Sequence, residues 1–150
     1  MLQIKEHLKR LLWQVSNPIL GRASQFYGRH KGEACYILGD GISVKSMNLA
    51  SFSNNLSIAL NYIPLHKDFP SLNCPYSVNS SPYLFSPYFG YSKPIRRHLN
   101  LMAKIIREVV ISRQEMNHFI SLSNYPFIRA HNVFHVFQNL PDSRLNTDFI

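Results

Sequence analysis

A chain of 150 residues can form one domain with a sizeable core, burying roughly two-thirds of its unfolded surface, but it leaves no room for a second complete domain. Its formal charge of +8 favours anionic partners such as phosphates, nucleic acids or membrane surfaces. No apolar run approaches the roughly 20 residues of a membrane span, and the N-terminus lacks the apolar core of a signal peptide, so we expect a cytoplasmic protein without a membrane span.

The N-terminal segment has the pattern of an amphipathic helix. From Leu2 to Val15, apolar residues recur on one helical face, and charged residues occupy the other. Asn17-Pro18 is expected to end this helix. Packing on the sheet or on a partner domain is the preferred interpretation, and contact with a membrane surface is the alternative. Residues 1–32 are assigned to this helix and a linker, 33–140 to a folded domain and 141–150 to a polar tail.

The central stretch reads as strand, glycine turn, short helix and strand. The apolar run over residues 34–38 predicts a buried parallel strand, and a second strand is predicted over 56–60. Between them, the glycines of Gly39-Asp40-Gly41 would allow positive φ and close approach of a ligand, and Ser43 could cap the following helix. Free N–H groups and a helix dipole at such a turn would seat a phosphate. An ordinary βα turn is the alternative, because the spacing lacks the third glycine of the dinucleotide fingerprint and the GK[ST] of a P-loop.

The run from His30 to Val44, HKGEACYILGDGISV, resembles the opening of the MptE-like domain of 6-hydroxymethylpterin diphosphokinase-like proteins. The bacterial family 42 sialyltransferases open in a similar way. In both families a G-N-G-P-S turn follows the first strand of a Rossmann-like sheet, and the second strand ends in Asn. Asp40 stands here where the families have Asn, and Ile42 where they have Pro. The resemblance implies that a nucleotide or sugar nucleotide, such as a CMP-sugar, contacts Gly39, Asp40, Gly41, Ser43 and Asn61.

Two further features lie at the expected ligand edge of the sheet. His66 and Lys67 follow the second strand and could meet a phosphate, although two solvated loop residues are the alternative. A third strand is predicted over residues 76–78, followed by Asn79. The sialyltransferases also have an Asn after their third strand, so the resemblance implies a nucleotide contact for Asn79. The Asp40 carboxylate would weaken phosphate binding but could accept hydrogen bonds from ribose hydroxyls.

The longest helix is predicted to start with Ser92 as its cap and Pro94 in its first turn, and to run to about Gln114. Its arginines could bind nucleic acid, but no paired aromatic platform or nucleic-acid motif accompanies them. We therefore interpret them as a solvated face and expect no nucleic-acid partner. Strands are predicted over residues 118–122 and 133–137.

Metal and thiol chemistry are not expected. His131 and His135 have i,i+4 spacing, which suits a metal only on a helix, and they lack the Glu of HExxH. Cys35 and Cys74 lack metal-ligand spacing and are expected to be reduced thiols. No Ser/His/Asp set, carboxylate pair or activated Cys is evident, so no catalytic residue is assigned.

These patterns predict an α/β fold, a Rossmann-like three-layer sandwich with a mostly parallel sheet, forming an incomplete domain. In the resembling transferases the general base lies in a second half, which this sequence does not include. One hypothesis is that the chain is the nucleotide- or sugar-nucleotide-binding part of a glycosyltransferase-like or MptE-like protein. The resemblance implies a role in the biosynthesis of bacterial surface glycans. The alternative is a truncated, non-catalytic module that binds a nucleotide weakly or pairs with a protein. We expect that this chain alone does not turn over a substrate. We also expect it to pair with a missing C-terminal half or with a second copy of itself.

Overall fold

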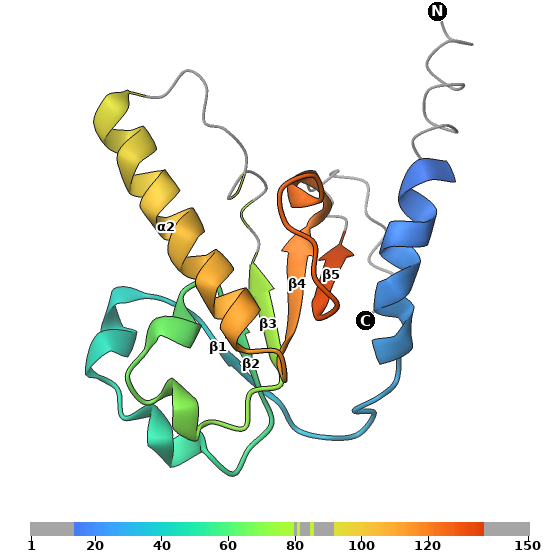
Figure 1. The fold of residues 1–150 in the computed structure, drawn as a ribbon. Coiled ribbons are helices and arrows are strands. Elements are labelled where there is room, and N and C mark those ends of the chain that lie inside the picture. Colours follow the sequence, from blue (N-terminus) through green and yellow to red (C-terminus); the bar gives the residue numbers. More distant parts are fainter. Residues whose placement is uncertain (1–13, 80, 82–84, 86–91, 137–150) are drawn as a thin grey trace, which may run out of the picture.

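A computed structural model describes residues 14–79, 81, 85 and 92–136. Its centre is a five-stranded sheet in which every neighbouring pair is parallel, with strand order β1-β2-β3-β4-β5 (Figure 1). This confirms the predicted α/β fold with a parallel sheet. The strands are β1 (Tyr36–Leu38), β2 (Ser57–Leu60), β3 (Tyr76–Asn79), β4 (Asn117–Ser121) and β5 (Val133–Val136).

Each strand adds to the sheet directly beside its predecessor, so the strand order never reverses. Because successive crossovers step in one direction, the right-handed rule places their connections on one face. The helix α2 (Lys93–Ser112) is the longest of these connections and joins β3 to β4. On this face Ile106 and Val110 of α2 pack against Ile120 of β4 and Val133 of β5.

The connections from β1 to β2 and from β2 to β3 contain only short 3-10 helices. They are η2 (Ile42–Ser46), η3 (Leu49–Phe52), η4 (Ile63–Leu65) and η5 (Phe69–Ser71). Under them, Ala59, Ile63, Phe69 and Met116 form a second, smaller core. The short helix predicted after the glycine turn is therefore two 3-10 segments.

The N-terminal segment covers the opposite face of the sheet. Phe26, in η1 (Arg22–Phe26), makes edge contacts with the rings of Tyr76, Phe119 and Phe134, with centroids 5.7, 5.1 and 4.8 Å apart. Arg22 donates a hydrogen bond to the His131 carbonyl over 2.8 Å. This aromatic contact joins η1 to strands β3, β4 and β5.

Three local expectations are corrected. Helical structure over residues 14–21 continues through Asn17-Pro18, because a proline inside a helix removes one hydrogen bond and need not end it; the part of the predicted helix before residue 14 lies outside the described residues. Ser92 holds the N-cap position of α2, but its side chain makes no capping bond, whereas Pro94 lies in the first turn as predicted. The helix ends at Ser112.

The first strand is parallel as predicted, but it is not buried. It lies at the edge of the sheet, where Tyr36 and Ile37 are 43% and 68% exposed. An edge strand has one neighbour instead of two, and in the described part of the chain its connection to β2 contains only 3-10 helices. Among the helices that the structure describes, none has the length and apolar character to cross a membrane.

Candidate functional site

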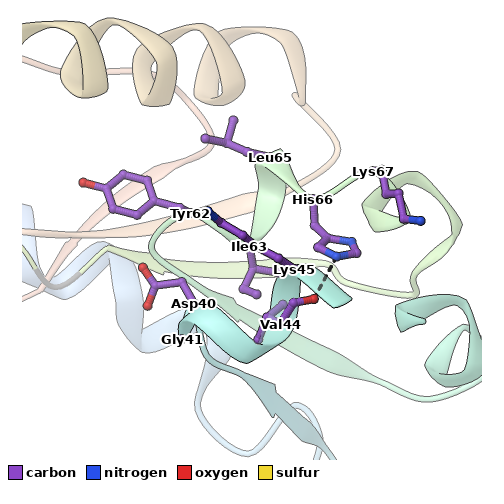
Figure 2. A pocket seen from close by; sticks show the side chains of 9 residues that line it. All are labelled: Asp40, Gly41, Val44, Lys45, Tyr62, Ile63, Leu65, His66 and Lys67. Atoms are coloured by element: carbon purple, nitrogen blue, oxygen red, sulfur yellow. Dashed lines mark hydrogen bonds between the residues drawn. The ribbon is translucent and has the colours of Figure 1, made fainter. Parts of the chain in front are cut away.

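A pocket of about 340 Å³ lies at the carboxyl ends of β1 and β2 (Figure 2). The loop after β1 forms one wall and the loop after β2 forms the other. In open parallel sheets, ligands bind at this edge. The pocket is lined by Asp40, Gly41, Val44, Lys45, Tyr62, Ile63, Leu65, His66 and Lys67.

A hydrogen bond connects two of the predicted site residues. The Asn61 amide Nδ2 donates to Asp40 Oδ1 over 3.4 Å and so links the loops after β1 and β2. Asn61 has a φ of 46°, in the left-handed region that asparagine tolerates better than most residues. This backbone conformation turns the chain sharply at the end of β2. The structure therefore brings Asp40, Gly41 and Asn61 together.

The glycine turn differs from the expectation. Neither Gly39 nor Gly41 has a positive φ, and Gly41 has φ −60° and ψ 156°. A Cβ built on Gly39 would meet no atom within 4 Å, and one on Gly41 would meet only Ser43 Oγ at 3.9 Å. Since Gly41 lines the pocket, the absence of a side chain there keeps space open for a ligand.

Ser43 does not cap a helix. It lies inside η2, whose N-cap position is held by Gly41 without a side-chain bond. A 3-10 segment of five residues also aligns few peptide dipoles, so the expected dipole contribution to phosphate binding is weak. Positive charge in the pocket comes instead from Lys45 and Lys67.

His66 has a structural role in the pocket wall. The Asp68 backbone N–H donates to His66 Nδ1 over 3.2 Å, so the ring proton is on Nε2, which donates to the Val44 carbonyl over 3.1 Å. Both ring nitrogens therefore have hydrogen-bond partners, and the bond from Nε2 to the Val44 carbonyl connects the two loops (Figure 2). The hypothesis that His66 meets a phosphate is not favoured by this geometry.

The two ends of the pocket differ in chemistry. Asp40 and Tyr62 lie at one end, and Lys67 lies at the other, beyond His66 (Figure 2). Burial, with a smaller contribution from the Asp40 charge, raises the pKa of Tyr62, so its phenol stays protonated as a hydrogen-bond donor. The pocket thus offers a carboxylate acceptor and a hydroxyl at one end and an ammonium group at the other.

Asn79 lies outside this pocket. It is the buried last residue of β3, and its Oδ1 accepts a hydrogen bond from the Ser81 N–H over 3.3 Å. With Asn61 and His118 it lines a separate cavity of about 10 Å³ beneath α2. In that cavity Ser77 Oγ and His118 Nδ1 are 2.6 Å apart. The nucleotide contact implied for Asn79 would therefore require a different site from the one at Asp40.

Comparison with known proteins gives no information on the function of this pocket. No family model, curated protein or solved structure matches significantly. The resemblance of residues 30–44 to MptE-like domains and family 42 sialyltransferases stays a prediction, so the chemistry of the pocket has to be argued from its own residues.

The described residues supply binding groups more readily than reacting groups. Burial raises the pKa of Cys74 to about 11, which keeps this thiol protonated at neutral pH. The Ser77 and His118 pair is buried under α2, away from the 340 Å³ pocket. Among the described residues, no group of three His, Cys, Asp or Glu side chains is placed to hold a metal ion.

Lys45 and Tyr62 are the polar pocket residues that sequence reasoning did not single out. Tyr62 directly follows Asn61, and Lys45 lies four residues after Gly41. The loop after β1 brings Lys45 to the pocket, and the loop after β2 brings Tyr62. Their proximity to the glycine turn and to the end of the second strand is the signal that could have identified them.

Proposed function

We propose that the pocket at the ends of β1 and β2 binds a nucleotide or sugar nucleotide, as the ligand-binding part of a glycosyltransferase-like or MptE-like protein. One observation carries the proposal: Asp40 and Tyr62 at one end of the pocket and Lys67 at the other match the hydroxyl and phosphate groups of such a ligand. Lysine is a common phosphate ligand, and a carboxylate accepts hydrogen bonds from vicinal hydroxyls. The volume of about 340 Å³ is at the lower end of the range typical of small-molecule sites.

The same geometry favours binding over turnover. The only histidine on the pocket wall, among the residues described, has both ring nitrogens in hydrogen bonds with the protein. General base catalysis needs a free acceptor within hydrogen-bond reach of the attacking group, and here that role would fall to the Asp40 carboxylate, which the proposal assigns to the ligand hydroxyls. The alternative of a non-catalytic binding module is therefore retained, and the two versions share the same pocket.

Titration with a panel of ligands tests the proposal. The panel contains inorganic phosphate, ribose 5-phosphate, CMP, UMP, AMP and CMP-sialic acid, followed by isothermal titration calorimetry and by chemical-shift mapping. We expect nucleotides to bind more tightly than inorganic phosphate and to shift the amides of residues 40–45 and 61–67. Equal affinity for phosphate and all nucleotides would show that only charge attracts the ligand.

The two glycines of the turn provide a matched pair of variants. Gly41→Val should place a branched side chain in the pocket and weaken nucleotide binding at least about tenfold, because Gly41 lines the pocket. Gly39→Val is the control, since Gly39 has an equally ordinary backbone but does not line the pocket. Equal loss in both variants, or no loss in Gly41→Val, would contradict the assignment. Turnover of CMP-sialic acid, or of a pterin with ATP, that disappears in Gly41→Val would contradict the non-catalytic version.

A further inference from the structure

The outer side of α2 carries several positively charged side chains, one of which, Lys104, lies 3.9 Å from the Glu108 carboxylate. The helix contains five cationic residues and a single acid, Glu108. At about 100° per residue, the five cations fall within roughly 100° of the helix circumference, and at 1.5 Å per residue they extend over about 21 Å. All five are exposed. We call this surface the basic stripe: Lys93, Arg96, Arg97, Lys104 and Arg107.

The apolar side of the same helix is already used. Ile106 and Val110 face the sheet and are buried in its core. A membrane-surface helix needs an apolar face free to enter the headgroup region, and in the half of α2 that packs on the sheet this face is not available. Leu101 and Ile111 are 55% and 59% exposed near the stripe, but the main apolar face that a bilayer would have to receive is buried against the sheet, so the stripe suits a polyanion better than a bilayer.

An exposed aromatic ring lies at the carboxyl end of the stripe. Arg107 Nη2 donates a hydrogen bond to the Phe127 carbonyl over 3.3 Å, which fixes residue 127 beside the last cation. The Phe127 side chain is 38% exposed. Exposed rings next to cations are the platforms on which unpaired bases stack, and each stacked base contributes substantially to affinity. This neighbour is 20 residues away in the sequence, which is why the helix pattern alone did not indicate it.

We propose that the basic stripe and Phe127 form a docking surface for single-stranded nucleic acid, bound through its phosphates with one base stacked on Phe127. Charge complementarity is the reason for choosing a nucleic acid as the partner. Three of the five cations are arginines, whose planar guanidinium groups bind phosphates through pairs of hydrogen bonds. The surface is separate from the pocket at β1 and β2 and revises the expectation of no nucleic-acid partner. It does not rest on the proposed nucleotide site.

Fluorescence anisotropy with a labelled oligouridylate of about 15 nucleotides tests the stripe on the full chain. Binding should weaken steeply between about 50 and 200 mM salt. Arg96→Glu/Arg97→Glu should lower the affinity at least about tenfold and reduce the salt slope by about 1 to 2. The control Arg29→Glu/Lys31→Glu changes the net charge equally at two exposed positions outside α2, and should stay within about twofold of the parent.

Phe127→Ser separates stacking from charge. It should lower the affinity about fivefold or more and leave the salt slope unchanged, with far-ultraviolet circular dichroism confirming the fold. Equal losses in the stripe and control pairs would show that net charge alone binds the oligonucleotide and would overturn the proposal. So would displacement by excess CMP, or tighter binding to phosphatidylserine vesicles than to the oligonucleotide at equal phosphate concentration.

Discussion

The two ends of the sheet are covered in different ways. At the β4 and β5 end, α2 packs on one face, where Ile120 and Val133 are 1% and 0% exposed, and the Phe26 ring packs on the other. At the β1 end, short 3-10 helices replace a long helix, and Ile37 is largely exposed. The thin cover leaves the 340 Å³ pocket between the two loops. One end is thus built for stability, and the other has space for a ligand.

This difference has a practical consequence for the candidate site. A segment of three to five residues buries less apolar surface than a helix of 20 residues, so it contributes less to the free energy of unfolding. Changes in the pocket should therefore affect ligand binding more than stability. Changes at the other end should do the reverse, and the following predictions measure that contrast.

The largest effect is expected from one buried and one exposed isoleucine. Ile120→Ala removes a fully buried side chain from the core beneath α2 and should lower the free energy of unfolding by about 4 kcal/mol. Ile37→Ala makes the same chemical change on the edge strand, where the side chain is mostly in water, and should cost less than about 0.5 kcal/mol. Urea unfolding followed by circular dichroism measures both. Similar losses would mean that the β1 end is covered by a contact that its exposure does not show.

Acid should weaken the same buried end. Burial lowers the pKa of His118 from 6.5 to about 4, an effect that the nearby Arg113 carbonyl and Glu115 only partly oppose. The unfolded state therefore binds this proton more readily, so the stability is complete above about pH 6.5 and is lost as the pH falls toward 4. The loss attributable to His118 should reach about 3 kcal/mol.

We compare the free energy of unfolding of the parent and of His118→Gln from pH 7 to pH 4. The difference between them isolates the contribution of His118 from those of the carboxyl groups and of His135, because burial lowers the pKa of His135 as well. Nuclear magnetic resonance titration of the His118 ring gives a second measurement. A midpoint near 6.5 would show that water reaches the ring.

The strands could be predicted because each is a short apolar run between turn residues, and the five observed strands fall within two residues of the predicted ones. Their order could not, because periodicity says which side chains are apolar but not which strand is an edge. For this reason β1 was expected to be buried. The predicted fold class is confirmed, whereas the exposure of β1 depends on its place at the edge of the sheet, which the sequence pattern does not encode.

The candidate site was predictable only in part. The resemblance implied that Asp40 and Asn61 belong to one site, and a hydrogen bond joins these two side chains in the structure. The role of His66 depends on the Val44 carbonyl, 22 residues earlier, and no local pattern encodes that bond. Asn79 is the last residue of β3 and Asp40 follows β1, and these strands are two positions apart in the sheet, which explains why the two side chains line different cavities.

A moderate effect is expected from the N-terminal aromatic contact. Phe26→Ala removes edge contacts with three rings on the face opposite α2, and since the side chain is half-buried it should cost about 2 kcal/mol. The neighbouring Tyr27 is 96% exposed, so Tyr27→Ala should change stability by less than about 0.5 kcal/mol. Thermal unfolding of the two variants compares them directly. If Phe26→Ala were equally harmless, the N-terminal segment would contribute nothing to this end of the sheet.

The smallest effect is expected at the thinly covered end, where Asp40→Asn should change ligand preference without changing stability. The neutral amide removes a negative charge from the pocket but keeps an oxygen that can accept the Asn61 bond, so the two loops stay linked. Affinity for inorganic phosphate and for the phosphate end of a nucleotide should rise about fivefold.

If Asp40 accepts hydrogen bonds from ribose hydroxyls, the same substitution should weaken binding of the unphosphorylated nucleoside, because an amide oxygen is a poorer acceptor than a carboxylate. Calorimetry with phosphate, cytidine and CMP separates the two effects. Glu33→Gln removes one carboxylate charge from an exposed position outside the pocket and is the control for net charge. Opposite shifts for phosphate and cytidine would assign Asp40 to the sugar, whereas equal gains in Asp40→Asn and Glu33→Gln would show that the pocket senses only the total charge of the chain.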